Sequence, residues 1–294
     1  MLTKKQFDVL TLIERTKSPL TQRDIGQRLG MSLGMVNKSV AELTEKGLLH
    51  GGQVTAQGYD ALEPYRVKRA VVFAAGFGSR LIPITLNTPK PLVRVKGTRI
   101  IDSMLDAIYA AGISEVYIVR GYLAEQFDQL LYKYPDIRFI ENPLFNEANN
   151  ISSALYARHL LQNAYVCEAD LLLYNPELIT KYQYQSNYLG VPVEMTHDWC
   201  LYTKGGYVSR LAIGGTGCYH MFGISYWDEA DGARLSDHIM QVFSAPGGKE
   251  RYWDQVALEY HIGEYRIAVR PCTFDDIAEI DTYQELKNID STYI

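Results

Sequence analysis

Val71-Val72-Phe73-Ala74-Ala75-Gly76-Phe77-Gly78-Ser79-Arg80-Leu81, with Pro89-Lys90-Pro91-Leu92 shortly after it, decides the fold of this 294-residue chain. The stretch begins as an apolar, β-branched run, which predicts a buried strand. A loop of small residues follows, in which Gly76 and Gly78 allow backbone N–H groups to approach an anion closely. Arg80 and Lys90 add two cations, which suit a polyphosphate better than a single carboxylate. The stretch therefore predicts a loop that binds a nucleoside triphosphate.

Composition places the chain among ordinary globular proteins, with 47% apolar and 21% charged residues. No apolar run approaches the roughly 20 residues of a membrane span, and the first residues, MLTKKQFDVL, do not form a signal peptide. The four cysteines are scattered, which favours reduced thiols over a structural zinc site. We therefore expect a cytoplasmic protein. The part after residue 66 is acidic, which argues against nucleic acid as the main partner of the chain.

The pattern of residues 1–66 predicts a separate helical unit with a small β wing. Thr21 is expected to cap a helix that ends at Gly30, and Ser32 is expected to cap the helix that follows. Two helices joined by such a short turn are typical of a helix-turn-helix. The run TQRDIGQRLGMSLGMVNKSVAELTEKGLL resembles the winged helix-turn-helix domains of bacterial regulators. The resemblance implies a winged-helix domain at the N-terminus.

The role of this domain stays open at the level of sequence. On the second helix of the motif, the candidate contacts to bases or phosphates are Asn37, Lys38 and Ser39, with Arg23 and Arg28 nearby. Besides DNA binding, the domain could sense a ligand, pack on the rest of the chain or form a homodimer.

Residues 67–294 are predicted to form an α/β domain with a Rossmann-like, mostly parallel sheet, because strands and helices alternate up to about residue 185. After that point the pattern changes to short β-rich pieces within 188–225, and a helix is predicted over 249–260. Ligands bind at the carboxyl ends of the strands in such sheets. We assign nucleotide binding to residues 67–185 and acceptor binding to residues 186–294.

Two acidic residues are candidate Mg²⁺ ligands. Asp170 follows a buried strand, and a carboxylate at that end of the sheet, opposite the phosphate loop, is well placed for a metal that bridges phosphate oxygens. Asp281 precedes the last predicted helix. Each acid also has a simpler interpretation, as a helix cap or a turn residue.

Polar residues near two further strands form the candidate site for the base or the ribose. Gly121 and Tyr122 follow one strand, and Asn149, Asn150 and Ser153 lie at the start of a predicted helix. An Asn amide can read the Watson–Crick edge of a pyrimidine, although Asn150 could equally cap that helix.

The second half of the α/β domain contains three aromatic–acid groups and one further carboxylate, and these form the candidate acceptor site: Asp198-Trp199, Trp227-Asp228, Tyr252-Trp253-Asp254 and Glu279. Aromatic faces with nearby carboxylates can form a cage for a quaternary ammonium group. A phosphosugar would require hydrogen-bonding polar groups instead. Each aromatic residue, taken alone, would also fit a position in the core.

Residues 74–92 resemble the signature of the nucleotidyltransferases that make sugar-nucleotides and CDP-alcohols. Residues 69–290 further resemble the bacterial CTP:phosphocholine cytidylyltransferases. The segments that carry this resemblance are AAGFGSRLIPITLNTPKPLVRV, IVRGYLAEQFD, NNISSALY, GISYWD, YWDQV and EIDTYQEL. The chain departs from that family at Glu168, which replaces a neutral residue and adds an acid beside the metal, and in its extra N-terminal domain.

The resemblance implies a role for each group of residues. The backbone of Ala74, Ala75, Gly76 and Gly78 would hold the nucleotide. Arg80 and Lys90 would act on the phosphates, with Lys90 between the α-phosphate and the attacking phosphate. Asp170 and Asp281 would bind Mg²⁺. The residues implied to hold phosphocholine are Trp199, Trp227, Tyr252, Trp253, Asp254 and Glu279.

The expected reaction is therefore Mg²⁺-dependent transfer of CMP from CTP to phosphocholine. A phosphate monoester is already a nucleophile at neutral pH, so the reaction needs no general base. Two alternatives stay open. The acceptor could be another small phospho-alcohol or an aminoalkyl phosphonate, or the chain could be a ligand-sensing regulator whose transferase-like body controls the winged helix.

Overall fold

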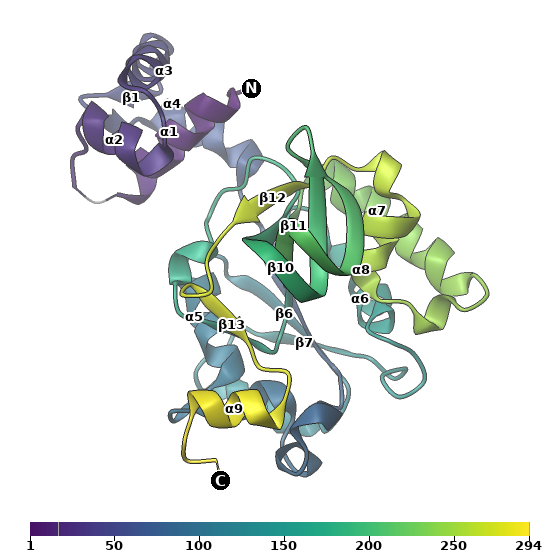
Figure 1. Ribbon diagram of the computed structural model, residues 1–294. Helices are drawn as coiled ribbons and strands as arrows, with labels where there is room; N and C mark the ends of the chain where they lie inside the picture. The colour runs from purple at the N-terminus through teal and green to yellow at the C-terminus, as the bar shows by residue number, and fades with distance from the viewer. Residues whose placement is uncertain (17, 294) are drawn as a thin grey trace. The chain divides into compact units, whose positions relative to one another are not determined.

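The computed structural model describes residues 1–16 and 18–293 of the chain. The chain separates by its contacts into two compact units, whose elements are labelled in Figure 1. The first unit contains Met1–Arg66 together with the short segment Tyr182–Tyr184, and the second contains the rest of the described chain.

The first unit has the predicted helix-turn-helix and wing. Thr21 and Asp24 form a capping box at the start of the second helix, which ends at Gly30 in the left-handed conformation with φ of 62°. The hydroxyl of Ser32 accepts a hydrogen bond from the backbone N–H of Met35 and so caps the next helix. The elements are α1 (Lys4–Arg15), α2 (Gln22–Leu29), α3 (Leu33–Glu45), β1 (Leu49–His50), β2 (Gln53–Val54) and α4 (Ala56–Leu62).

The segment Tyr182–Tyr184 completes the apolar core of the first unit. The ring of Tyr184 stacks on that of Tyr65 with centroids 5.6 Å apart and lies 5.3 Å from the ring of Phe7. The hydroxyl of Tyr184 donates to the backbone oxygen of Leu2. Tyr182 is buried in the same cluster. The winged-helix unit is therefore built from two stretches of sequence that are far apart in the chain.

The second unit contains a seven-stranded sheet of order β10-β12-β11-β8-β3-β6-β7. The strands β8, β3, β6 and β7 run parallel, whereas β11 is antiparallel to β8 and to β10. This is the predicted α/β class with a mostly parallel sheet. The strands are β3 (Arg69–Ala74), β6 (Glu115–Arg120), β7 (Arg138–Glu141), β8 (Ala164–Glu168), β10 (Asn187–Lys204), β11 (Tyr207–Trp227) and β12 (Ala268–Pro271).

Helices cover the sheet on both faces because side chains alternate along the buried central strand. Val72 of β3 packs in one core with Ile101 and Ile108 of α5, while Val71 packs in a second core with Ile239 of α7. In Figure 1, α6, α7 and α8 lie on one side of the sheet and α5 on the other. The helices are α5 (Ile100–Ala110), α6 (Ile151–Ala157), α7 (Glu229–Ser244), α8 (Trp253–Gln255) and α9 (Tyr283–Ile289).

Two stretches differ from the prediction. The short β pieces within 188–225 are parts of two long strands, β10 and β11, whose pairing is interrupted by bulges such as the one between Thr196 and Trp199. Each bulge breaks the alternation from which strand limits were predicted. The helix predicted over 249–260 is confirmed only from Trp253 to Tyr260, because the extended backbone of Tyr252 separates a 3-10 turn from α8 and the π-helix Val256–Tyr260.

The end of the chain returns to the carboxyl end of β8. Strand β13 (Ile277–Glu279) pairs antiparallel with β9 (Leu171–Leu173), and the N–H of Ile280 donates to the oxygen of Asp170. The remaining short strands are β4 (Arg94–Val95) and β5 (Thr98–Arg99). Within the described residues, no helix combines the length and the apolar character that a membrane span requires.

Candidate active site

A cavity of about 690 Å³ opens at the carboxyl ends of β3 and β8. Its walls contain most of the residues predicted to bind the nucleotide or the metal. These lining residues are Ala74, Ala75, Gly76, Gly78, Arg80, Lys90, Asn149, Asn150, Ser153, Asp170 and Asp281. Parallel strands bring them together because each strand ends at the same edge of the sheet.

Gly78 has the backbone geometry that the phosphate loop requires. Its φ is 62°, in the left-handed region that residues with a Cβ rarely adopt. A Cβ at this position would lie 2.8 Å from Cβ of Lys90 and 3.1 Å from Cγ2 of Thr85. The hydroxyl of Thr85 donates to the carbonyl of Gly78 and fixes the turn. Gly78 thus sets the distance between the loop and Lys90.

Lys90 lies at the centre of the charged groups. Its Nζ donates to Oδ2 of Asp170 at 2.7 Å and to Oδ1 of Asp281 at 2.8 Å. The guanidinium of Arg80 also contacts Oδ1 of Asp281 at 2.9 Å and is mostly exposed. Burial acts to lower the pKa of Lys90, but the charges of Asp170 and Asp281 outweigh it and raise that pKa to about 12. Lys90 is therefore a permanent cation at neutral pH.

The acids around Lys90 fit a divalent cation. Oδ1 of Asp170 is buried and has no hydrogen-bond partner among the described residues. One carboxylate oxygen each from Asp170, Glu168 and Glu279 lies within 4.8 Å of the others. Hard oxygen ligands of this kind are those that Mg²⁺ prefers. Asp170 is therefore suited to the predicted metal, whereas Asp281 lies outside this cluster and its Oδ1 contacts Lys90 and Arg80.

Asn150 lies at the start of α6, but its side chain makes no capping hydrogen bond to that helix and contacts other elements instead. Its Nδ2 donates to Oε1 of Glu168 at 3.1 Å, and its Oδ1 accepts from the backbone N–H of Trp253 at 2.9 Å. Asn149 donates through Nδ2 to the backbone oxygen of Glu250. The two amides thus connect α6 to β8 and to the segment that precedes α8.

Gly121 and Tyr122 lie next to the phosphate loop and its neighbouring segment. The N–H of Tyr122 donates to the oxygen of Ala75, and its hydroxyl donates to the oxygen of Thr85 at 2.9 Å. Gly121 packs against the ring of Phe145. In the structure these two residues hold the shape of the phosphate loop, whereas the sequence suggested contact with the base or ribose.

The carboxyl groups of Glu168, Asp254 and Glu279 belong to the region where the acceptor was predicted to bind. Burial is the main cause that raises the pKa of Glu168 well above its usual range, and the charge of Asp254 adds to it. Burial likewise raises the pKa of Asp254 to about 7 and that of Glu279 well above its usual range. Gly223 leaves space for Glu168, since a Cβ there would lie 2.3 Å from its Oε2. This region strongly favours a positive charge.

The predicted aromatic cage is different from what the structure contains. Trp227 is fully buried, and its indole N–H donates to Oγ of Ser225. Trp253 is 1% exposed and packs edge-on against Phe73. By contrast, Trp199 and the 43% exposed Tyr252 form an edge-to-face pair with centroids 5.4 Å apart.

Sequence reasoning missed several residues of the cavity wall. Asn142 is buried and donates through Nδ2 to the hydroxyls of Ser152 and Ser153. It follows β7 directly, but β7 is partly exposed, so a search for polar residues after buried strands would not have identified Asn142. Phe77 and Phe145, whose rings lie 5.3 Å apart, also line the cavity.

The predicted DNA contacts on α3 are only partly accessible. Asn37 and Lys38 are exposed, and so are Arg23 and Arg28 on α2. Ser39 is 5% exposed and packs inward, so its proposed role as a DNA contact is wrong. Helical periodicity explains the difference, because Ser39 follows Val36 by three residues and shares its buried face.

Comparison with known families gives two matches. The nucleotidyl transferase family matches residues 69–186, and the MarR family matches residues 2–54. The first match contains the phosphate loop, Lys90 and Asp170. The second contains the helix-turn-helix and the wing.

Individual relatives extend the match to about three quarters of the chain. The 2-aminoethylphosphonate cytidylyltransferase of Lancefieldella rimae is 34% identical over 229 residues, which are 76% of this chain and 93% of that protein. The choline-phosphate cytidylyltransferase of Haemophilus influenzae is 33% identical over 75% of this chain and 95% of that protein. The solved structure of the CTP:phosphocholine cytidylyltransferase from Streptococcus pneumoniae superimposes with a TM-score of 0.72 at 30% identity, covering 78% of this chain and all of that one.

Proposed function

We propose that this chain, which belongs to the nucleotidyl transferase family and is a cytidylyltransferase, transfers CMP from CTP to a small acceptor. The acceptor would be a phosphonate or phosphate that carries a primary ammonium group. The observation that carries the proposal is the position of Lys90. It joins Asp170 to Asp281 on the wall of a cavity that also contains the glycine loop.

The residues of this chain would neutralise the charge of the substrates and hold them in position. The loop at Gly76 and Gly78 would bind the triphosphate through backbone N–H groups. Lys90 would contact both the α-phosphate and the attacking oxygen, which offsets the repulsion between two anions. Arg80 would stabilise the departing pyrophosphate. The attacking oxygen is already anionic at neutral pH, so no side chain has to remove a proton.

Asp170 and Asp281 would hold Mg²⁺, which when bound neutralises phosphate charge and orients the oxygens of the triphosphate. Lys90 contacts both acids, so the cation and the metal ligands form one group whose members constrain one another.

The acceptor is proposed from the charges beyond Lys90. Glu168, Asp254 and Glu279 supply carboxylates that can accept hydrogen bonds from the three N–H donors of a primary ammonium. A trimethylammonium has no such donors and is bound best by open aromatic faces. The burial of Trp227 and Trp253 in the core therefore favours the primary ammonium.

Phosphocholine is the second candidate acceptor. The half-exposed pair of Trp199 and Tyr252 supports it, because two rings in edge-to-face contact offer part of a cage. Of the similar proteins, some are named for 2-aminoethylphosphonate and others for choline phosphate.

Pyrophosphate release with CTP and Mg²⁺ tests both assignments when three acceptors are compared. Phosphoethanolamine and phosphocholine differ only in the three N-methyl groups, and 2-aminoethylphosphonate lacks the ester oxygen, so that its carbon is bonded directly to phosphorus. We expect kcat/KM to be higher for phosphoethanolamine than for phosphocholine. The reverse order would assign the quaternary ammonium, and no release with any of the three would overturn the acceptor class.

We also propose that the first unit binds DNA through α3. The match to the MarR family and the exposure of Lys38, Arg23 and Arg28 support this role. A gel shift with DNA from upstream of the coding sequence tests it. Lys38→Glu should weaken the shift, whereas Lys133→Glu, in the second unit, should not. A shift of equal strength with both variants would exclude α3 as the contact.

A further inference from the structure

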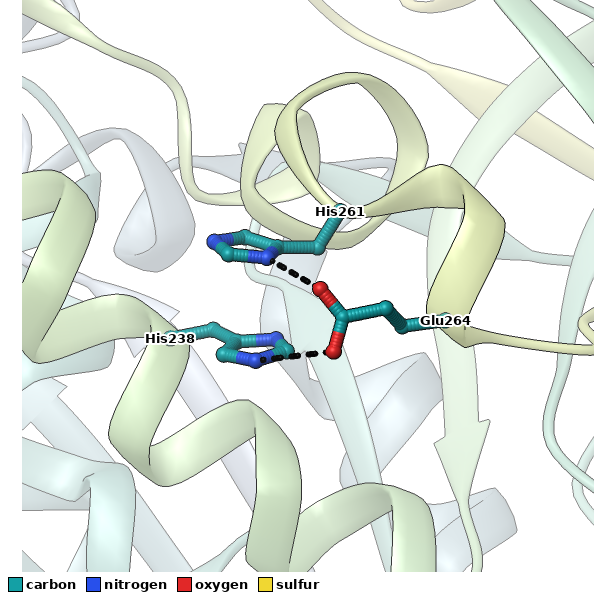
Figure 2. A group of neighbouring side chains, drawn as sticks. All are labelled: His238, His261 and Glu264. Atoms are coloured by element: carbon teal, nitrogen blue, oxygen red, sulfur yellow. Dashed lines mark hydrogen bonds and ion pairs between the residues drawn. The ribbon is translucent and has the colours of Figure 1, made fainter.

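A second cluster of ligating side chains lies outside the cavity. Figure 2 shows the imidazoles of His238 and His261 stacked on one another, with the carboxylate of Glu264 facing both. The ring centroids are 3.6 Å apart and the planes differ by 10°. One ligand atom from each of the three residues lies within 4.8 Å of the other two.

We propose that His238, His261 and Glu264 bind a divalent transition-metal ion of the zinc class. Two imidazoles and one carboxylate are the protein ligands of known open zinc sites, in which a water molecule completes the tetrahedron. Imidazole also selects Zn²⁺, Co²⁺ and Ni²⁺ over Mg²⁺. The site is therefore separate in chemistry, as well as in position, from the acids around Lys90.

Both histidines present a ring nitrogen to the carboxylate of Glu264 at close range. Nδ1 of His261 lies 2.8 Å from Oε1 of Glu264, and Nε2 of His238 lies 3.5 Å from Oε2. A tetrahedral ion with bonds of about 2.0–2.1 Å holds its ligand atoms about 3.3 Å apart. The two observed separations end on different oxygens of Glu264, so binding of one ion through a single carboxylate oxygen would require small rotations of these side chains. Figure 2 shows both nitrogens on the edge of the stack that faces the carboxylate.

His238 has the outer partner that a metal-binding histidine requires. Its Nδ1 lies 2.8 Å from the hydroxyl of Tyr265, which fixes the ring and directs Nε2 toward Glu264. Burial lowers the pKa of His238, and the neighbouring His261 lowers it further.

The site is open to solvent at one side and charged groups surround it. The carboxylate of Glu264 is 54% exposed, which provides an entry path for the ion. Arg234 is the nearest cation, and it is paired with Asp231 and with the backbone oxygen of Glu264. Asp237 adds a further negative charge on α7.

The ion would connect two elements that cover the sheet. His238 belongs to α7, while His261 precedes, and Glu264 ends, the 3-10 turn Ile262–Glu264 that follows the π-helix. Tyr252 and Asp254 of the proposed acceptor site lie in the same segment, just before that π-helix. Bound metal would therefore stabilise the segment on which the acceptor residues lie.

Metal binding to the full, chelator-treated protein tests the proposal. Co²⁺ is titrated in the presence of millimolar Mg²⁺, which competes for the acids around Lys90, and visible absorption reports tetrahedral coordination. Thermal unfolding with Zn²⁺ is measured in parallel. The variants are His261→Ala and Glu264→Gln, with Tyr265→Phe for the outer partner. His50→Ala, on the exposed wing, is the matched control.

We expect the wild type and His50→Ala to show the tetrahedral Co²⁺ spectrum and a Zn²⁺-dependent increase in Tm. His261→Ala and Glu264→Gln should each bind at least about tenfold more weakly, and Tyr265→Phe about tenfold more weakly. Circular dichroism and unchanged Mg²⁺-dependent pyrophosphate release show that the variants fold. Equal affinity of the wild type and either ligand variant, or no binding by the wild type, overturns the proposal.

Discussion

Nζ of Lys90 donates to Oδ1 of Asp281 at 2.8 Å, although the two residues are 191 positions apart in the chain. The contact exists because β13 pairs with β9 and thereby returns the end of the chain to Asp170. Strand pairing far from the phosphate loop thus determines the position of a charged group on the wall of the cavity.

Lys90→Met should remove activity and leave the fold in place. The substitution keeps an unbranched side chain but removes the charge that we assign to both phosphates. We expect kcat/KM to fall by about 10³ or more. Pyrophosphate release measures this, and Lys133→Met, at an exposed lysine, serves as the control. A Lys90→Met enzyme with near wild-type turnover would contradict the role of this residue.

Gly78→Ala should lower both stability and activity. The new Cβ would need φ of 62° and would lie 2.8 Å from Cβ of Lys90, so we expect the free energy of unfolding to fall by about 1–3 kcal/mol. Gly76→Ala is the matched control, because a Cβ there meets nothing within 4 Å among the described residues. Urea unfolding compares the two, and equal losses would show that the strain at Gly78 is unimportant.

Glu168→Gln should change the preference for the acceptor. The amide oxygen can still accept from Nδ2 of Asn150, but the charge that would bind an ammonium is lost. We expect kcat/KM for phosphoethanolamine to fall by about 10–100-fold, with a smaller change for phosphocholine. Glu125→Gln, at an exposed position, is the control. Equal losses of kcat/KM for both acceptors would show that Glu168 does not distinguish between them.

Asp254→Asn should stabilise the protein increasingly as pH rises. The pKa of Asp254 in the folded chain, about 7, lies above its ordinary value of 3.8, so the folded state retains a proton that the unfolded state has lost between these two values. Wild-type stability therefore falls as pH rises from about 4 to about 7. The Asn variant avoids this loss, on the order of 2 kcal/mol or more.

Urea unfolding of the wild type and Asp254→Asn between pH 4 and pH 8 measures that difference. The hydroxyl of Tyr188, which donates to Oδ1 of Asp254 at 2.8 Å, can donate to the amide oxygen as well. Asp136→Asn, at an exposed carboxyl, should follow the wild-type curve. A constant difference between Asp254→Asn and the wild type across this range would mean that Asp254 does not change its charge.

Sequence patterns predicted the fold and the charged centre of the site for a physical reason. The β-branched run before Gly76 could only be a buried strand, and residues that follow parallel strands meet at one edge of the sheet. Asp170 was therefore predicted to lie opposite the phosphate loop, whereas the role of Lys90 came from the resemblance to a family. The resemblance to a family was needed to add Asp281, whose position depends on the pairing of β13 with β9.

The burial of individual side chains could not be predicted in the same way. An aromatic residue beside an acid has the same local sequence in a wall and in a core, so the spacing of Trp227 and Asp228 did not reveal that the indole is buried. Gly121 and Tyr122 likewise contact the loop through tertiary packing that no local pattern encodes. The cluster of His238 and His261 joins residues from two elements, and no motif links them in sequence.

The tripeptide Tyr182–Tyr184 has a consequence for any attempt to separate the two units. A simple fusion of a regulator in front of an enzyme would connect them once, whereas this chain passes from one unit to the other three times. A protease that cut after Arg66 would leave Phe7 and Tyr65 still holding Tyr184. Transplanting residues 1–66 onto another transferase would likewise carry an incomplete domain, because Tyr182 and Tyr184 belong to its apolar core.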